Sequence, residues 1–386
     1  MSDLDRLRLA RTEGVGPVTY RRLLRRYPDP AEAIAALPAL ARAGGRATAP
    51  HIPSAAGAER EFDRIARLRG RLLFVDRPDY PPWLALLDDA PPVLAVLGRV
   101  EALHGRAVAL VGSRNASANG QRLAELLAQD LAQERITVVS GLARGIDAAA
   151  HEGALRSGLT VAAVAGGVDV PYPPEHARLQ ARIAEQGAVV GELPPGIQPQ
   201  ARHFPRRNRV IAGLSLGVVV VEAASRSGSL ITARLAQEAN RELFAVPGSP
   251  LDPRCRGAND LIRNGAHLVE GAADVLANLP DHPAREGLAR VPLFARPAAP
   301  PTGLPEPLPA WPETGPQVGP DGGDGARVRG TLLQLLGPAP TSVDDLARRC
   351  QLSAATVNSA LMDLELAGRV AALPGNRFAL IGEAGP

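Results

Sequence analysis

The sequence predicts an α/β fold with a doubly wound, mostly parallel sheet, because short apolar runs alternate with helical segments over residues 71–280. The runs that carry this prediction are 107–111, 136–139, 160–164, 188–190, 218–221 and 243–246. Uninterrupted apolar strands are typical of sheets buried on both faces. Glycine, serine or glutamate follows each run within two residues. Because ligands of such sheets bind beyond the carboxyl ends of the strands, we expect the functional site there.

Four regions are distinguished along the 386 residues. Residues 1–70 read as short helices, and residues 71–280 hold the alternating strands and helices. Residues 281–327 contain eleven prolines and seven glycines without periodicity, which predicts an extended, poorly ordered linker. A compact helical pattern resumes over residues 328–386. The chain is therefore expected to hold three folded domains and one linker.

Composition excludes several classes of enzyme. All 43 basic residues are arginine, so the lysine of a phosphate-binding P-loop and the lysine of Schiff-base chemistry are both missing. Cys255 and Cys350 stand far apart and indicate neither a disulfide framework nor a zinc site. There is no apolar run long enough to span a membrane and no secretory signal pattern at the N-terminus. We expect a cytoplasmic protein without cofactor or metal.

Small residues and arginines gather in the segments that follow the predicted strands. Small residues let a ligand approach the backbone, helix N-termini offer N–H groups to anions, and arginine matches phosphate. Repeated over five loops, this pattern predicts a long anion-binding groove rather than one nucleotide pocket. The candidate binding residues are Gly112, Ser113, Arg114, Ser140, Gly141, Arg144, Gly166, Gly167, Arg206, Arg207, Asn208, Arg209, Ser227, Gly228 and Ser229.

Four titratable residues near these loops raise the question of catalysis. Asp147 and Asp169 are read as helix caps or loop-orienting residues in preference to catalytic carboxylates. Glu222 is expected to accept hydrogen bonds from loop N–H groups, and His151 is expected on a helix face. No catalytic residue and no metal ligand is therefore assigned.

Two aromatic residues lie in the same loops. Tyr172 and Phe204 are candidates either for stacking on bases or for anchoring the loops. Both readings stay open on the sequence alone.

The order of the motifs carries a family resemblance over residues 71–280. The motifs include Gly112-Ser-Arg114, Ser140-Gly-Leu-Ala-Arg-Gly-Ile-Asp147, Gly166-Gly-Val-Asp-Val-Pro-Tyr-Pro173, Phe204-Pro-Arg-Arg-Asn-Arg-Val-Ile-Ala-Gly213 and Ser227-Gly-Ser-Leu-Ile-Thr232. Together they resemble the DNA-processing protein A (Smf) family. The resemblance implies an extended Rossmann-like domain that binds single-stranded DNA, with Arg114 and Arg206 to Arg209 at the DNA.

The resemblance also implies partners and a role. It implies a homodimer that protects incoming DNA and loads the RecA recombinase during natural transformation, and single-strand binding protein is a further candidate partner. The alternative is a nucleotide or nucleoside-monophosphate hydrolase on a related fold. Such hydrolases carry a Pro-Gly-Gly-x-Gly-Thr-x-x-Glu run where this chain has Ser225-Arg-Ser-Gly-Ser-Leu-Ile-Thr232. We therefore expect a binding protein and no enzyme.

The N-terminal region contains a candidate phosphate-binding hairpin. Glu13-Gly-Val-Gly-Pro17 and the helical stretch after it resemble a helix–hairpin–helix (SAM-like) element. Such a hairpin presents backbone N–H groups to a phosphate. Arg21, Arg22, Arg25 and Arg26 stand where they could assist. The alternative is a small helical packing domain that does not touch DNA.

The C-terminal region reads as a winged helix. One helix begins near Thr341, a second runs over 353–366, and a hairpin over 368–380 turns at 374–376. The second helix would read duplex DNA in such a fold, and a DNA-reading helix is basic. Here it carries Asp363 and Glu365 and no base. The charges predict a protein-interaction role instead.

Overall fold

The computed structural model of the chain describes residues 2–44, 48–280, 324–337, 339–373 and 377–381. Contacts divide the chain into two compact units, Ser54–Glu286 and Met1–Pro53 with Gly287–Pro386. Most of the predicted linker at 281–327 and the predicted turn at 374–376 lie outside the described residues. The four-region division of the chain stays a prediction.

The unit Ser54–Glu286 is built on one sheet of nine strands. Its order is β1-β2-β6-β5-β4-β3-β7-β8-β9. The strands are β1 (Arg71–Phe74), β2 (Val93–Gly98), β3 (Ala107–Val111), β4 (Thr137–Ser140), β5 (Thr160–Ala163), β6 (Ala188–Gly191), β7 (Gly217–Val220), β8 (Glu242–Ala245) and β9 (His267–Leu268). Six of them, β3 to β8, confirm the six predicted apolar runs.

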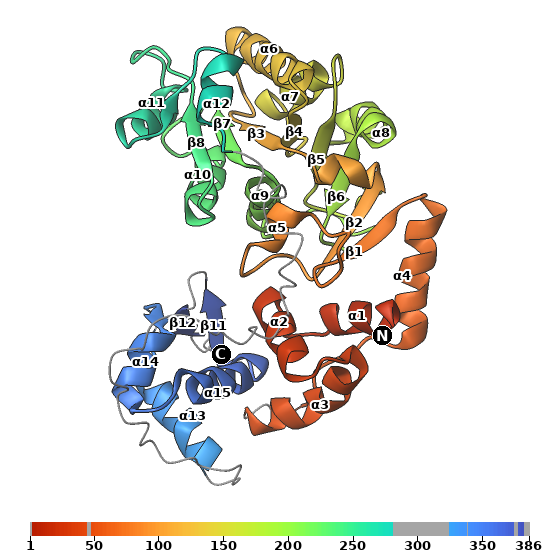
Figure 1. Ribbon diagram of the computed structural model, residues 1–386, viewed down its shortest axis with the longest axis vertical. Coiled ribbons are helices and arrows are strands. Elements are labelled where there is room, and N and C mark those ends of the chain that lie inside the picture. Colours follow the sequence, from red (N-terminus) through yellow and green to blue (C-terminus); the bar gives the residue numbers. More distant parts are fainter. Residues whose placement is uncertain (1, 45–47, 281–323, 338, 374–376, 382–386) are drawn as a thin grey trace, which may run out of the picture. The chain divides into compact units, whose positions relative to one another are not determined.

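The strand order is that of a doubly wound fold with an extension. From β3 the chain builds β4, β5 and β6 to one side, then returns to the other side of β3 for β7, β8 and β9 (Figure 1). All these neighbours pair in parallel. Beyond β6, the strands β2 and β1 add antiparallel pairs. The predicted Rossmann-like, mostly parallel sheet is confirmed.

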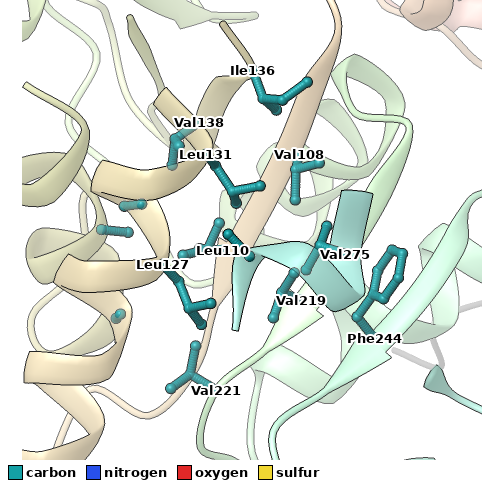
Figure 2. Close-up of a cluster of buried hydrophobic side chains, with 14 of the residues drawn as sticks. Val108, Leu110, Leu127, Leu131, Ile136, Val138, Val219, Val221, Phe244 and Val275 are labelled. Carbon is teal, nitrogen blue, oxygen red and sulfur yellow. The ribbon is translucent and has the colours of Figure 1, made fainter. Parts of the chain in front are cut away.

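Apolar residues of the strands and of the helices packed on them form the core of this unit. Helix α6 places apolar residues at helical spacing on one side, including Leu127 and Leu131, and these pack against Val108, Leu110 and Val219 of the central strands (Figure 2). Helix α6 begins directly after Ser117, because the side-chain oxygen of this serine caps the first turn.

Helices connect the strands and complete the unit. They are α4 (Ala55–Arg67), α5 (Pro82–Ala85), α6 (Ala118–Gln133), α7 (Ile146–Ala154), α8 (Ala177–Gln186), α9 (His203–Leu214), α10 (Ser229–Glu238), α11 (Arg256–Arg263) and α12 (Ala272–Asn278), with 3₁₀ turns η1 (Val100–Leu103) and η2 (Pro174–His176). Among the described residues, no helix has the length and apolar character needed to cross a membrane.

The other unit holds two helical groups. The first comprises α1 (Asp3–Ala10), α2 (Pro17–Arg26) and α3 (Pro30–Ala43). The second comprises α13 (Asp324–Leu335), β10 (Thr341–Ser342), α14 (Val343–Cys350), α15 (Ala354–Leu366), β11 (Val370–Leu373) and β12 (Arg377–Leu380). The three strands pair in the order β10-β12-β11 over a core that includes Leu346, Leu361 and Phe378. This arrangement is the predicted winged helix.

Candidate nucleic-acid interface

The carboxyl ends of the parallel strands bring the predicted binding segments to one edge of the sheet. Gly112, Ser113 and Arg114 follow β3; Ser140 ends β4 and Gly141 and Arg144 follow it; Gly166 and Gly167 follow β5; Arg206, Arg207, Asn208 and Arg209 lie in α9 after β6; Ser227 and Gly228 precede α10, which Ser229 opens. The strands β4 to β6 lie on one side of β3, and the strands β7 to β9 lie on its other side, so the strand order reverses between β3 and β7. This edge is therefore the switch point at which doubly wound sheets bind ligands.

Glu222, just past β7, holds the loop that carries Arg114. Its carboxylate accepts a hydrogen bond from the Ser117 backbone N–H at 2.9 Å and another from the Ser117 hydroxyl. A side chain at Gly120 would lie 2.5 Å from the same carboxylate, so the first turn of α6 packs directly on it. Glu222 is the predicted acceptor for loop N–H groups, and it leaves Arg114 exposed at the rim.

The loops after β3 and β4 are locked to one another. The Ser113 carbonyl accepts the Ile146 N–H at 3.2 Å. Gly145 has φ +74°, and a Cβ there would lie 2.3 Å from the Ser113 oxygen. Only glycine tolerates both the left-handed backbone and this close approach.

A buried ion pair joins the loop after β4 to α9. The Asp147 carboxylate lies 3.6 Å from Arg207 Nη1, and both side chains are less than a tenth exposed. The same carboxylate accepts the N–H groups of Gly141 at 3.2 Å and Ala143 at 3.3 Å. Burial raises the pKa of Asp147, while Arg207 and the two N–H groups act against that rise. Asp147 therefore orients the loop, as predicted.

Phe204 of α9 is the centre of a cluster of cations and rings. The guanidinium carbon of Arg114 lies 5.1 Å from the ring centroid, and that of Arg207 lies 5.7 Å from it. Both distances are within the range of cation–π attraction. Tyr172 meets Phe204 edge-on at 5.8 Å and is 46% exposed. Phe204 anchors the two arginines, and Tyr172 presents a ring to solvent.

The arginines of α9 differ in their surroundings. Arg206 is exposed. Arg209 is paired with Asp89 at 3.0 Å and Glu192 at 2.7 Å, and its side chain is 13% exposed. These two carboxylates raise the pKa of Arg209 against the effect of burial. Of the three predicted arginines, Arg206 is the one whose charge faces solvent, whereas Arg207 and Arg209 hold α9 in place.

The glycines after β5 pack against the loop 194–199. A Cβ at Gly166 would lie 2.7 Å from the Ile197 oxygen, and Gly167 donates its N–H to that oxygen at 2.8 Å. Asp169 secures the same loop, because it accepts the Gly196 N–H at 2.6 Å and pairs with Arg64 at 2.8 Å. Close packing between loops thus explains both glycines, and Asp169 orients a loop as predicted.

The start of α10 has open space at Gly228. The Ser227 and Ser229 hydroxyls are 2.7 Å apart, and Ser227 also accepts the Ser229 N–H at 3.3 Å. A side chain at Gly228 would meet nothing within 4 Å. Elsewhere, Arg144 is exposed and bonded to Glu175.

His203 is a residue of this edge that sequence reasoning did not select. It lines a small cavity together with Glu192, Arg206 and Arg207. The volume of this cavity, about 10 Å³, matches one water molecule. Burial and the charges of Arg202 and Arg206 lower the pKa of His203. A histidine in the first turn of an arginine-rich helix was the available signal. Within the described ranges, no three His, Cys, Asp or Glu residues are placed to hold a metal.

Three family models match segments of the chain. The family described as DNA recombination-mediator protein A matches residues 71–280. The DprA winged helix domain matches residues 314–376, and the DprA-like N-terminal HHH domain matches residues 1–63.

Individual relatives agree with this assignment. Protein Smf of Escherichia coli (strain K12) is 42% identical over 306 residues, which cover 79% of this chain and 76% of that protein. DNA processing protein DprA of Streptococcus pneumoniae (strain ATCC BAA-255 / R6) is 48% identical over 201 residues, which cover 52% of this chain and 71% of the relative.

Solved structures share the fold. DprA from Streptococcus pneumoniae superposes with a TM-score of 0.61 at 36% identity, covering 73% of this chain and 99% of that one. DprA from Helicobacter pylori, whose structure is described as giving insight into its single-stranded DNA binding mode, superposes with a TM-score of 0.50 at 28% identity, covering 55% and 95%. The chain therefore belongs to the DNA recombination-mediator protein A family.

Proposed function

We propose that this chain binds single-stranded DNA along the carboxyl edge of its sheet and performs no chemistry on it. The observation that carries the proposal is the placement of Arg114 and Arg206. Both guanidinium groups are exposed at the switch point, while buried carboxylates fix the segments that carry them. Exposed arginines on fixed segments are suited to phosphates, because the positions of their backbones are set before the strand arrives.

Bases are proposed to stack where the phosphates are held. Tyr172 presents an exposed ring beside Phe204, and Arg114 lies over the Phe204 ring. A base has a π-face whatever its identity, so such contacts tolerate any sequence. Gly228 and the N–H groups at the start of α10 offer a further approach for the backbone of the strand.

The absence of catalysis is inferred from how the candidate acids are used. Asp147 and Glu222 accept backbone N–H groups, and Asp147 also faces Arg207. A carboxylate committed to such contacts is poorly placed to take a proton from a substrate. His151 is buried against Thr160, away from solvent.

The cellular role is proposed from the family. Its description as a recombination mediator supports a protein that holds incoming DNA and loads RecA, in natural transformation where the host takes up DNA. We further propose a cytoplasmic homodimer, with single-strand binding protein as another partner. A dimer would place two grooves on one strand and so gain avidity.

The first prediction tests the binding edge by substitution. Arg114→Ala with Arg206→Ala should weaken single-strand binding by roughly tenfold for each lost charge-assisted contact. The dependence of log K on log salt should also become shallower, by about one unit per contact. Fluorescence anisotropy of a labelled strand across a salt series measures both quantities.

Arg99→Ala is the matched control. Arg99 is exposed and follows β2, whose end pairs with the start of β6, so it lies at the opposite edge of the sheet. Arg99→Ala removes one positive charge, as each of the single variants Arg114→Ala and Arg206→Ala does, without touching the proposed edge. Equal weakening by Arg99→Ala and by the two single variants would mean that only net charge matters, and unchanged binding by the double variant would place the DNA elsewhere.

A further inference from the structure

The winged helix packs against the N-terminal helices within the unit Met1–Pro53 and Gly287–Pro386. Helix α15 contacts α2 and α3. In a DNA-reading winged helix, the helix equivalent to α15 enters the major groove. Here the surface of α15 is turned to its own chain, which raises the question of what the contact does.

Arg22 of α2 is the polar centre of this contact. Its guanidinium lies 4.0 Å from the Glu365 carboxylate, and both side chains are about 15% exposed or less. The guanidinium carbon also lies 4.8 Å from the ring centroid of Phe378 on β12. One arginine of the helix–hairpin–helix region is thus enclosed between an acid and an aromatic ring of the winged helix.

The backbones approach closely at a second point. A Cβ at Gly44, which ends α3, would lie 1.8 Å from the Asp363 carbonyl oxygen and 3.1 Å from Ala367 Cβ. The backbone at Gly44 is in the ordinary helical region, with φ −74°. The glycine is therefore required by the approach of α15 and not by the backbone conformation.

The charges of the two surfaces are complementary. Helix α2 has four arginines and no acid, whereas α15 has Asp363 and Glu365 and no base. Burial raises the pKa of both carboxyl groups, and Arg22 and Arg26 of α2 act in the opposite direction on Glu365 and Asp363 respectively. Arg329 of α13 also pairs with Asp363 at 3.3 Å.

We propose that α15 is an intramolecular cover for α2, in which Glu365 occupies Arg22, an arginine that would otherwise hold a phosphate of duplex DNA. Docked, Glu365 takes the place of a phosphate at Arg22. The winged helix then has the chain's own N-terminal helices as its protein partner. Duplex DNA binds through α2 only when α15 moves away, so the two compete.

The test uses full-length variants that weaken the cover. Glu365→Gln removes the charge with little change of shape, and Gly44→Ala places a methyl group against the Asp363 carbonyl. Each should raise the affinity for a labelled duplex by about tenfold, as expected for a gained phosphate contact. The dependence of log K on log salt should become steeper by about one unit. The gain should disappear when Arg22→Ala and Arg26→Ala are added.

Matched controls separate this mechanism from general effects. Asp344→Asn removes an exposed acid from α14, and Gly330→Ala adds a methyl group at a position of α13 where nothing lies within 4 Å. Neither should change the affinity. The series is repeated with Arg114→Ala and Arg206→Ala present, so that the sheet edge does not contribute to duplex binding. The same relative increase in duplex affinity is then expected, whether or not single strands bind at that edge.

Hydrogen exchange reports the docking itself. The α2 amides should exchange faster in Glu365→Gln than in the wild type, and wild-type protection should not change on dilution, because the contact lies within one chain. Unchanged duplex affinity in both cover variants would overturn the proposal. So would protection of α2 that falls on dilution, since the partner would then be a second copy of the chain.

Discussion

At the scale of single residues, His151 shows how burial sets a protonation state. Its Nδ1 lies 2.7 Å from the Thr160 hydroxyl, which itself donates to the Val138 carbonyl at 2.8 Å. The hydroxyl hydrogen is thus used, so Nδ1 must carry the proton that joins the two residues. Among the described atoms, Nε2 has no hydrogen-bond partner. Burial, and then the charges of His176 and Arg207, lower the His151 pKa to about 3.

The second prediction follows from this pKa. An unfolded histidine titrates near 6.5, so between about pH 6.5 and 3 the unfolded chain binds a proton that the folded chain refuses. The free energy of unfolding should therefore fall on acidification through this window, by at most about 1.4 kcal/mol per pH unit from His151.

His151→Asn keeps a donor toward Thr160 and removes the titrating ring. Its free energy of unfolding, measured with urea at several pH values, should depend less steeply on pH than that of the wild type. Parallel curves for the two proteins would show that His151 is accessible to protons in the folded state.

At the scale of elements, Gly141 shows that a predicted binding residue can have a packing role. A Cβ at this position would lie 1.1 Å from Arg207 Nη1 and 2.7 Å from Asp147 Oδ2. The glycine thus allows α9 and the loop after β4 to share one buried ion pair. Arg209 acts similarly, because Asp89 and Glu192 join α9 to other segments through it.

The third prediction concerns this packing. Gly141→Ala should separate Arg207 from Asp147 and leave a buried charge without its partner, at a cost on the order of 3 kcal/mol of stability. Single-strand binding should weaken as well, because Arg207 and Arg114 share the Phe204 ring. Thermal unfolding and anisotropy measure the two effects.

Gly228→Ala is the control for this change. It lies at the start of α10, where a methyl group meets nothing within 4 Å. Its stability should stay within about 0.5 kcal/mol of the wild type. If Gly141→Ala were as stable as Gly228→Ala, the buried pair would not organise the edge.

At the scale of the whole molecule, the fourth prediction separates the sheet from the tail. A chain that ends at Leu279 should keep the single-strand affinity of the full chain or slightly exceed it, since α2 is then uncovered. The neutral winged helix contributes five arginines and five acids, so its loss removes no net attraction for phosphates. A large loss of affinity with unchanged oligomeric state would show that the winged helix holds the strand.

The fifth prediction concerns the outcome of binding. The protein should speed the nucleation of RecA on strands already coated with single-strand binding protein, and it should neither hydrolyse ATP nor cleave DNA. The physical reason is that a held strand and a recruited recombinase meet at high local concentration. Nucleation rates measured with and without the protein test this, with Arg99→Ala as the active control. No acceleration over a range of concentrations, with binding confirmed, would leave a binding module without mediator activity.

The sequence alone determined the doubly wound sheet, because buried parallel strands leave apolar runs such as 107–111 and 218–221 that neighbouring helices must cover. It did not single out β9, whose two residues are too few to form a pattern. It also placed small residues and arginines at the strand ends. Only the tertiary structure decided which of them face solvent.

That decision depends on partners remote in sequence. Glu222 reaches Ser117, Asp147 reaches Arg207, and Arg209 reaches Asp89, so identical arginine side chains become either structural or exposed. A burial pattern repeats locally, whereas the carboxylate that neutralises an arginine comes from another strand or loop. The acids of α15 show the same limit: their charge predicted a protein-interaction role, and only the fold shows that Glu365 contacts Arg22 of α2.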